Sequence, residues 1–398
     1  MKVLQINTVC GILSTGRICT DLAEVLEENG HECKIAYGRM NVPEKYQKYA
    51  ICIGNSFTKK IDAVCSRLLD NTGFNSWFPT LRLVKQIKEF TPDIIHLHNL
   101  HGSYINIKIL FKFLKKYNKP VVWTLHDCWT YTGHCAHFTN IGCEKWRTQC
   151  FKCPLKHSYP KSLFLDNSVL NYKLKKKLFT SLDDVTLITP SQWLADVTKQ
   201  SFMGKYNVIP VPNGIDLEVF KPTEGDFRQR YGLEGKVIVL GVASSWDENK
   251  GLDDFVKLAG RLDDAFKVVL VGLTNKQLSQ MPESILGITR THSVHELAEI
   301  YTTADVFLNL TYQDTYPTVN LEAQACGTPV ITYSTGGSVE SADQENVVPC
   351  GDIDILLHRV KELTSCDKDI EKTLKKAKSF KKELSFCKYL EIYEQQVR

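Results

Sequence analysis

The chain has no run of about 18 apolar residues, so none of its 398 residues is expected to form a membrane-spanning helix. The opening segment, M-K-V-L-Q-I-N-T, is interrupted by polar side chains, which predicts that no signal peptide is present. An excess of one charge is also missing, because 49 basic and 45 acidic residues leave a net charge of only +4. That balance argues against a nucleic-acid-binding protein. We therefore expect a cytoplasmic protein without a nucleic-acid partner.

Two common ligand-binding patterns are absent or misplaced. Gly11 and Gly16 flank the first expected strand-to-helix loop, but their spacing is not G-x-G-x-x-G, so a dinucleotide site is not indicated. A tight turn is the alternative role of these glycines. The D-x-D triplet Asp352-Ile353-Asp354 follows the last expected strand, and we interpret it as a helix cap rather than a metal site.

The chain is long enough for two domains, and its pattern starts again half-way along. Short β-branched runs alternate with helix-like segments, which indicates parallel sheets with helices on both faces. We expect strands at residues 3–6, 33–36, 93–98, 121–125 and 185–189, and then at 208–209, 237–241, 267–272, 306–309, 330–332 and 347–348. The predicted fold class is α/β, with two Rossmann-like doubly wound domains facing a central cleft. The first would span residues 1–205 and the second residues 206–375, and ligands bind beyond the carboxyl ends of such strands.

The most informative segment is Y-Q-D-T-Y-P-T-V-N-L-E-A-Q-A-C-G-T-P-V-I, which contains Asp314 and Glu322. Pro317 keeps the preceding residue out of the α region, and proline is favoured in the first turn of a helix. We therefore expect Asp314 on a loop and Glu322 at least one turn inside a helix that begins near Pro317. The amides at such a helix start form an anion site. Two acids around this site can hold a sugar, its phosphates and a ribose; a surface acid and a helix-face acid without a ligand are the alternative.

This segment resembles the acidic E-x7-E region of the large retaining glycosyltransferase family that includes sucrose synthase and bacterial mannosyltransferases. The resemblance runs from K-V-L-Q-I-N to about Glu340 and is closest to the branch that assembles bacterial capsule and exopolysaccharide repeat units. It implies that Glu322 accepts hydrogen bonds from ribose hydroxyls and that Asp314 approaches the sugar ring. The chain departs from the family at Asp314, which replaces a glutamate and reaches less far. The resemblance also implies glycosyltransferase B-type architecture, with a last helix at residues 376–398 that crosses back to the first domain.

The resemblance gives further donor-binding roles to residues of the second half. Lys250 ends the loop S-S-W-D-E-N-K-G after a strand, where it can neutralise a diphosphate together with the helix-start amides of Thr318 and Val319. A solvated loop lysine is the alternative. The family usually has an arginine five residues before this lysine, where the chain has Ser245 followed by Trp246.

Histidines mark the acceptor side in the first half. His126 follows the strand V-V-W-T-L at the family's T-x-H position, which contacts the transferred sugar or its acceptor. His96, His98 and His101 end a neighbouring strand, and His98 is a second candidate for the site. Satisfied structural histidines are the alternative. The resemblance also places residues 11–16 near the acceptor and the donor phosphates.

Cysteine is abundant, with 14 residues, and a reducing compartment favours free thiols. A Cys-rich insertion is expected at residues 128–160, and the four cysteines in the spacing C-x7-C-x6-C-x2-C are Cys135, Cys143, Cys150 and Cys153. Such spacing can hold a structural Zn²⁺, with Cys128, His134 and His137 as rival ligands. Free thiols, or disulfides after oxidation, are the alternative.

Lysines cluster at residues 108–119 and 173–177 of the first half. Interleaved apolar residues make the first cluster an amphipathic basic helix, which suits an anionic membrane surface. A solvated helix edge is the alternative. The membrane interpretation would add peripheral binding at the inner face of the plasma membrane.

Together with these features, the resemblance implies a retaining, metal-independent hexosyltransferase that needs no cofactor for catalysis. It would move a hexose from a UDP- or GDP-linked sugar to a lipid-linked saccharide acceptor in capsule, exopolysaccharide or O-antigen assembly. The alternatives are a nucleotide-sugar 2-epimerase or phosphorylase of the same fold, and a non-enzymatic zinc-knuckle binding module.

Overall fold

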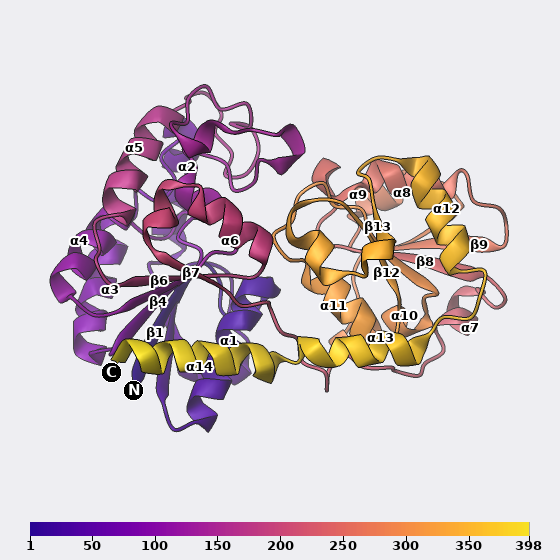
Figure 1. The fold of residues 1–398 in the computed structure, drawn as a ribbon. Coiled ribbons are helices and arrows are strands. Elements are labelled where there is room, and N and C mark those ends of the chain that lie inside the picture. Colours follow the sequence, from indigo (N-terminus) through magenta and orange to yellow (C-terminus); the bar gives the residue numbers. More distant parts are fainter. Residues whose placement is uncertain (398) are drawn as a thin grey trace. The chain divides into compact units, whose positions relative to one another are not determined.

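The computed structural model describes residues 1–397, which divide into two compact units (Figure 1). The first unit holds Met1–Pro212 and the segment from Phe386 onward, and the second holds Asn213–Ser385. The chain therefore leaves the first unit later than the expected residue 205. The reason is that β7 (Asn207–Pro210) pairs with the first sheet instead of opening the second. Residues 376–385 also belong to the second unit.

The first unit is built on a parallel sheet, which has seven strands within residues 1–397. Across the sheet the strands are β3 (Ala50–Cys52), β2 (Glu32–Tyr37), β1 (Lys2–Asn7), β4 (Ile94–Leu97), β5 (Val121–Thr124), β6 (Val185–Thr189) and β7. The strand order reverses between β1 and β4, which pair in parallel. In open parallel sheets of this kind, ligands bind at the carboxyl edge beside such a reversal.

The second unit repeats this order with six described strands. Across the sheet they are β10 (Ile285–Ile288), β9 (Phe266–Val271), β8 (Val237–Val242), β11 (Val306–Asn309), β12 (Val330–Tyr333) and β13 (Val347–Val348). The reversal falls between β8 and β11. Both orders are those of a Rossmann-like sheet, so the prediction of two Rossmann-like doubly wound domains is confirmed.

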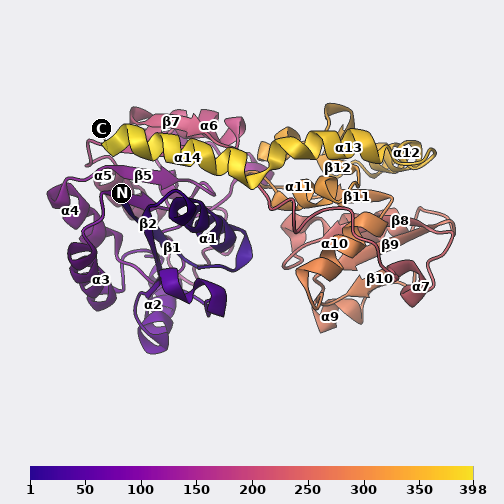
Figure 2. The same ribbon diagram turned by 90° about the horizontal axis from the view of Figure 1, so that it is seen from below.

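Helices cover both faces of each sheet (Figures 1 and 2). Those of the first half are α1 (Leu13–Glu28), α2 (Ser56–Leu69), α3 (Trp77–Phe90), α4 (Ile107–Tyr117), α5 (Ser168–Phe179) and α6 (Gln192–Lys199). Those of the second half are α7 (Phe227–Tyr231), α8 (Leu252–Ala259), α9 (Asn275–Leu278), α10 (Val294–Thr303), α11 (Thr318–Ala325), α12 (Ile353–Leu363), α13 (Ile370–Ala377) and α14 (Lys382–Val397).

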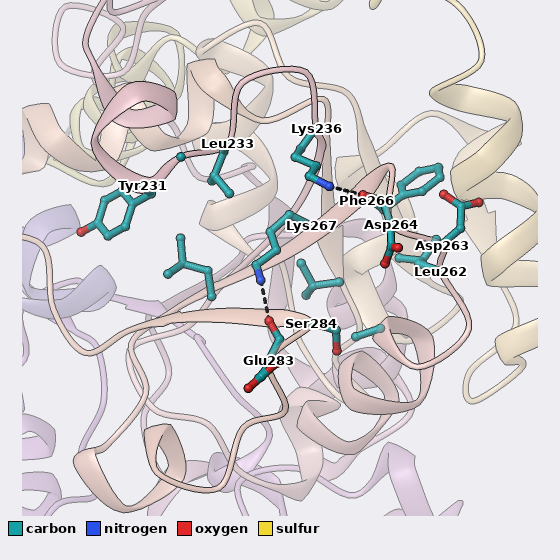
Figure 3. A pocket seen from close by; sticks show the side chains of 14 residues that line it. Tyr231, Leu233, Lys236, Leu262, Asp263, Asp264, Phe266, Lys267, Glu283 and Ser284 are labelled. Carbon is teal, nitrogen blue, oxygen red and sulfur yellow. Dashed lines mark hydrogen bonds between the residues drawn. The ribbon is translucent and has the colours of Figure 1, made fainter.

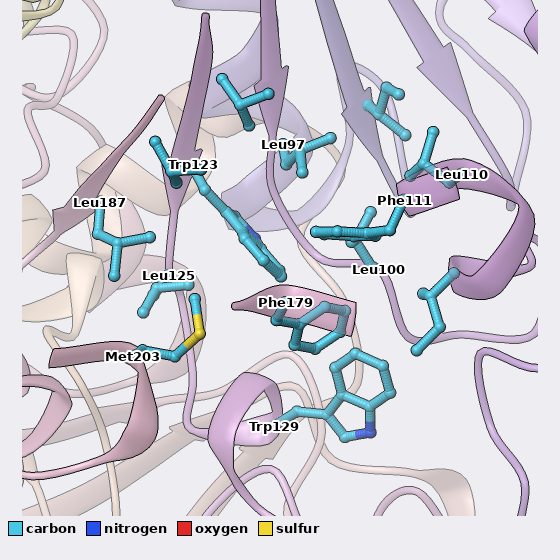
Figure 4. Close-up of a cluster of buried hydrophobic side chains, with 14 of the residues drawn as sticks. Leu97, Leu100, Leu110, Phe111, Trp123, Leu125, Trp129, Phe179, Leu187 and Met203 are labelled. Carbon is cyan, nitrogen blue, oxygen red and sulfur yellow. The ribbon is translucent and has the colours of Figure 1, made fainter. Parts of the chain in front are cut away.

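Alternate side chains of the first sheet feed two separate cores. Val3 packs in one core with α1 and the first-unit part of α14, whereas Leu4 packs in the other with α3, α4, α5 and α6. In the core that contains Leu4, the centroid of the Trp123 ring lies 5.6 Å from that of Phe111 and 4.9 Å from that of Phe179 (Figure 4). The Trp123 indole also donates a hydrogen bond of 2.9 Å to the carbonyl of His98, so the core fixes the loop after β4.

The second sheet is covered in the same way. Helices α10 and α11 contribute Tyr301 and Leu321 to the core on one face, and α8 and α12 contribute Phe255 and Leu356 to the other. Asp352 accepts a hydrogen bond of 3.0 Å from the amide of Ile355 and caps α12, which confirms its predicted capping role.

Two local predictions are corrected. The first helix begins at Leu13, so Gly16 lies in its first turns rather than at the end of a loop. Helix α4 turns its whole apolar side, including Leu110, Phe111 and Leu114, into the core. The lysines of α4 therefore lie at the surface, but the helix has no exposed apolar face beside them. Within the described residues, every helix is too short or too polar to traverse a lipid bilayer.

Candidate functional site

The loops after β8 and β11 meet at the reversal point of the second sheet. The amide of Tyr312 donates a hydrogen bond of 2.7 Å to the carbonyl of Asn249. Gly251 has a φ of +70°, and a Cβ built there would lie 2.3 Å from the carbonyl oxygen of Leu310. Only glycine fits this backbone shape and this close approach. The two loops therefore hold each other in a fixed arrangement.

This arrangement brings Lys250 and Asp314 together. The Lys250 Nζ lies 3.1 Å from Asp314 Oδ2, and both side chains are partly exposed. Asp314 Oδ1 accepts a hydrogen bond of 3.2 Å from the amide of Tyr316, and the Asp314 carbonyl accepts one of 3.1 Å from Gly337. As predicted, Asp314 lies on a loop just before a helix.

Glu322 lies in the second turn of α11, which begins at Thr318 after Pro317, as the proline predicted. Its carboxylate is only 5% exposed, and Oε2 accepts a hydrogen bond of 3.1 Å from the hydroxyl of Tyr301. Tyr301 is fully buried on α10. A buried carboxylate needs such donors, because an unpaired one would be costly to desolvate. No sequence pattern indicates a role for this tyrosine, since the contact depends on the packing of two helices.

The other predicted donor-binding residues lie at the start of α11 and in the loop after β8. Thr318 and Val319 are the first two residues of α11, so their amides belong to its first turn. Ser245 is exposed on the loop after β8. Trp246 is buried, and its indole donates a hydrogen bond of 2.9 Å to the carbonyl of Val271. Trp246, which follows Ser245 at the place of the family's arginine, therefore uses its polar atom within the fold.

In the first unit, the structure brings His98 and His126 into contact. They follow the neighbouring strands β4 and β5, and His98 Nδ1 lies 3.0 Å from His126 Nε2. The rings are nearly parallel, with centroids 5.3 Å apart. Burial keeps both side chains neutral, because it lowers the pKa of His126 to about 4 and the pKa of His98 well below its ordinary value.

The hydrogen bonds of Gln5 define which nitrogens carry the protons. Gln5 Nε2 donates to the carbonyl of Cys19 at 2.8 Å and to Cys33 Sγ at 3.3 Å, so Gln5 Oε1 is an acceptor. His98 Nε2, 3.0 Å from that oxygen, must then be the donor. Neutral His98 keeps its lone pair on Nδ1 and accepts from His126 Nε2. Nδ1 of His126 is therefore a hydrogen-bond acceptor.

Beside this pair, His101 and Asp127 form a hydrogen bond that the sequence did not predict. His101 Nε2 lies 2.6 Å from Asp127 Oδ2, and His101 Nδ1 lies 2.9 Å from the hydroxyl of Tyr159. Burial raises the pKa of Asp127, but His101, His137 and the amide of Trp129 together outweigh this effect and lower it to about 2. His96 instead contacts Tyr393 of α14 at 2.6 Å, so it serves the fold.

The glycine loop after β1 is tightly packed. The amide of Gly11 donates a hydrogen bond of 3.0 Å to the carbonyl of Gly16. Gly11 has a φ of +72°, and a Cβ there would come within 2.6 Å of the Tyr46 ring. Thr8 in the same loop donates a hydrogen bond of 2.7 Å to the carbonyl of His101. The loops after β1 and β4 are thus joined at the reversal point of the first sheet.

The four cysteines of the insertion lie near one another, but they do not form a ready metal site. The thiols of Cys135 and Cys153 are hydrogen-bonded, and this contact lowers the pKa of Cys153 to about 7. Cys143 and Cys150 pack against the same core. Among residues 1–397, no three His, Cys, Asp or Glu side chains are grouped closely enough to hold a metal ion. Zinc binding stays a prediction, which metal analysis of the purified protein and a Cys150→Ser variant tests.

Of the rival ligands of that prediction, His134 and Cys128 are buried and His137 is partly exposed. His134 Nδ1 lies 2.5 Å from Asp70 Oδ1. Lys175, from the second lysine cluster, is also buried. Its ammonium donates to the carbonyl of Trp129 and lies 3.8 Å from the centre of that ring, while burial lowers its pKa to about 7. Lys175 is therefore part of the core and not of a basic surface.

A pocket of about 460 Å³ lies elsewhere, at the amino ends of β8, β9 and β10 (Figure 3). Lys267 crosses it and donates a hydrogen bond of 2.5 Å to the carbonyl of Glu283, and Lys236 donates to the carbonyl of Asp264. Ligands of open parallel sheets bind at the opposite, carboxyl edge. This pocket is therefore not assigned to the candidate site.

Solved structures share this fold over almost their whole length. Sucrose-phosphate synthase from Thermosynechococcus elongatus superposes with a TM-score of 0.74 over 99% of this chain and 98% of its own, at 14% identity. HepE from Anabaena, solved in complex with UDP, gives a TM-score of 0.69 over 99% of this chain and 100% of its own, at 14% identity. These similarities define the class of fold, two Rossmann-like domains of the glycosyltransferase B type.

The sequence identifies the family within that class. Residues 15–219, a little over half of the chain, match Glycosyltransferase Family 4, and residues 236–365 match Glycosyl transferases group 1. The chain belongs to Glycosyltransferase Family 4, whose model matches more than half of it. The expected resemblance to a glycosyltransferase family is confirmed.

Curated relatives match only part of the chain. The putative colanic acid biosynthesis glycosyl transferase WcaC of Escherichia coli K12 is 30% identical over 229 residues, which are 54% of this chain and 55% of WcaC. The D-inositol 3-phosphate glycosyltransferase of Stackebrandtia nassauensis is 32% identical over 38% of this chain and 39% of its own length. The chain thus spans about half, or less, of the length of these relatives.

Proposed function

We propose that the protein is a retaining hexosyltransferase that uses a nucleotide-diphosphate sugar as donor and a saccharide as acceptor. The observation that carries this proposal is the 3.1 Å contact between Lys250 Nζ and Asp314 Oδ2. It lies at the carboxyl ends of the adjacent strands β8 and β11, just before the first turn of α11. A cation, a carboxylate and a helix N-terminus at one reversal point suit the phosphates and hydroxyls of a sugar nucleotide.

Each donor-side residue then has a distinct role. Lys250 and the first amides of α11, at Thr318 and Val319, stabilise the diphosphate as negative charge builds up on it. Asp314 accepts hydrogen bonds from hydroxyls of the sugar ring. Glu322 accepts hydrogen bonds from the ribose, in addition to the one from Tyr301.

The transfer itself exchanges one bond for another at the anomeric carbon. The bond between this carbon and the diphosphate oxygen breaks, and a bond to the acceptor hydroxyl oxygen forms on the same face. The acceptor proton passes to the departing diphosphate. In the first unit, His126 accepts a hydrogen bond from a hydroxyl of the sugar or the acceptor through Nδ1. No metal ion or cofactor takes part in this scheme.

The names of similar proteins support the choice of substrates. WcaC is named for colanic acid biosynthesis, and the fold of HepE was solved with UDP-glucose bound, with a TM-score of 0.69 at 13% identity. We infer a UDP- or GDP-linked hexose as donor and a lipid-linked saccharide in polysaccharide assembly as acceptor, at the cytoplasmic side of the membrane.

A ligand screen followed by a transfer assay tests the proposal. Melting temperatures measured with nucleoside diphosphates and their sugars identify the donor, because binding to the folded state stabilises it. Transfer of labelled sugar to an acceptor should fall below detection in Asp314→Ala and Glu322→Ala and stay unchanged in Asp354→Ala, whose exposed carboxylate forms an ion pair with Arg261. Proton NMR of the product reads the anomeric configuration, and EDTA should have no effect. Conversion of the donor without an acceptor, or an inverted product, would overturn the proposal.

A further inference from the structure

Helix α2 has its polar and apolar sides reversed relative to a normal surface helix. The residues that it buries are Asp62 and Ser66. Phe57, Ile61 and Val64, followed by Leu68, form an exposed stripe at helical spacing, and Phe57 is 70% exposed. A surface helix ordinarily turns such a stripe toward the core. An exposed apolar stripe over a buried polar side is therefore a feature that requires an explanation.

A hydrogen-bond network holds α2 in this orientation. Asp62 Oδ1 accepts hydrogen bonds from Ser66 at 2.9 Å and from Asn75 at 3.3 Å, and its other oxygen accepts from Ser76. At the end of the helix, Asp70 accepts from the amide of Asn167 at 2.7 Å. The helix is thus attached through polar contacts, and its apolar stripe is not a loosely packed core face.

Two neighbouring segments extend the apolar stripe. The first turns of α3 expose Trp77, Phe78 and Leu81, with Phe78 84% exposed, and a Cβ on Gly54 before α2 would lie 3.2 Å from Pro79 of α3. On the other side, the amide of Leu163 donates a hydrogen bond of 2.8 Å to the carbonyl of Arg67. This hydrogen bond attaches to α2 a loop whose residues Leu163, Phe164 and Leu165 are exposed; the exposed fraction of Phe164 is 70%. These contacts place the three exposed segments next to one another, and we call them together the α2–α3 face; α2 and α3 are labelled in Figures 1 and 2.

The charge of the α2–α3 face is mainly positive. Residues 56–90 contain six basic side chains and three acidic ones. Asp62 and Asp70 are buried, and the exposed Glu89 lies 3.7 Å from Lys85. Lys60, Arg67 and Arg82 are exposed among the apolar residues. Aromatic and aliphatic side chains surrounded by Lys and Arg are the pattern of helices that lie in the interface of an anionic bilayer.

We propose that the α2–α3 face docks the protein onto an anionic lipid bilayer. Phenylalanine and leucine side chains enter the boundary between headgroups and acyl chains, and the basic side chains contact lipid phosphates. A second copy of the chain is a poorer occupant, because a twofold contact would place the same cluster of positive charges against itself. The assignment replaces α4 as the membrane-binding element, since α4 buries its apolar side. It does not depend on the proposed function, because the bilayer alone is the ligand.

Co-sedimentation of the full chain with lipid vesicles tests the proposal. The protein should bind vesicles that contain phosphatidylglycerol much more tightly than vesicles of phosphatidylcholine alone, and salt should weaken the binding. The double variant Phe57→Ser/Phe78→Ser should reduce the partition coefficient by about tenfold or more, since both rings lose their burial in lipid. Both side chains are exposed, so the melting temperature of this variant should equal that of the wild type.

Matched charge variants separate this face from the rest of the surface. Lys60→Gln/Arg67→Gln/Arg82→Gln should weaken binding about 100-fold at low salt, at about fivefold per charge. Lys112→Gln/Lys115→Gln/Lys116→Gln on α4 removes the same charge and should change binding less than about twofold. Equal losses in both variants, or no binding of the wild type to anionic vesicles, would overturn the proposal. Self-association, or binding to an acidic protein, that is lost in Phe57→Ser/Phe78→Ser without vesicle binding would also overturn it.

Discussion

Replacement of Lys250 by methionine separates the phosphate role of this side chain from any role in stability. Methionine keeps most of the apolar stem and removes the charge. In the free protein, the lysine and aspartate side chains are 37% and 21% exposed, so their ion pair adds at most about 1 kcal/mol to the free energy of unfolding. We therefore expect Lys250→Met to lower the melting temperature by only a few degrees.

The effect on ligand binding should be larger. An ammonium about 4 Å from one phosphate charge is attracted by about 4 kcal/mol at an effective dielectric constant near 20. Asp314 already neutralises part of the lysine charge, and solvent screens more of it, so we expect a net loss of about 1.5–3 kcal/mol. That corresponds to a roughly 10- to 100-fold weaker binding of the nucleoside diphosphate.

Isothermal titration calorimetry with a nucleoside diphosphate and with the matching nucleoside measures this difference. Binding of the nucleoside should change little, because Lys250 contacts only the phosphates in the proposed complex. Lys257→Met is the matched control, since Lys257 forms a 3.0 Å ion pair with Asp254 in the same unit. Equal losses of affinity for diphosphate and nucleoside, or equal effects of Lys250→Met and Lys257→Met, would refute the reasoning.

Three further predictions follow from the geometry. Tyr301→Phe removes a donor from the buried carboxylate of Glu322 and should lower the free energy of unfolding by about 1.5–3 kcal/mol, as measured in urea; an unchanged midpoint would contradict this estimate. Gly251→Ala should cost roughly 2 kcal/mol or more and reduce donor binding, because its φ is +70° and its Cβ would meet Leu310. A Cβ at Gly260 would make only ordinary van der Waals contacts, so Gly260→Ala should be neutral or stabilising in the same urea titration. Acidification below about pH 6.5 should destabilise the first unit by up to about 1.4 kcal/mol per pH unit for each buried histidine, because the unfolded chain then binds protons that His96, His98 and His126 do not accept until the pH falls through their lower folded pKa. Circular dichroism between about pH 7 and pH 5 measures this change, His96→Gln should reduce its slope, and a pH-independent stability would contradict the argument.

Sequence patterns correctly predicted those elements whose local sequence favours the same structure that packing in the folded domain favours. The continuous apolar run at residues 237–241 became the central strand β8, and Pro317 correctly marked the start of α11. Asp314 and Glu322 could therefore be assigned to a loop and a helix from the proline between them. By contrast, β7 was assigned to the wrong sheet, because a short strand has the same sequence pattern in either one.

Side-chain environments were harder to predict, because they depend on elements far apart in the sequence. Trp246 lies in the expected loop, but only the position of β9 shows that its indole is used by the carbonyl of Val271. The pairing of His98 with His126 depends on β4 and β5 being neighbours, and the burial of Lys175 depends on Trp129. A lysine-rich segment and a histidine cluster have the same composition whether their side chains face solvent or the core.

The position of α14 has a consequence for biosynthesis on the ribosome. Its residues from Phe386 onward belong to the first unit, where Tyr389 lies 3.2 Å from Thr124 and Tyr393 lies 2.6 Å from His96. These tyrosines, with Phe386, Leu390 and Ile392, complete a core whose remaining residues are translated before the second unit. Part of one face of the first sheet therefore stays exposed until residues 386 onward have been translated and have left the ribosome. Nascent chains stalled before Phe386 should be much more sensitive to protease in their first 212 residues than the released protein.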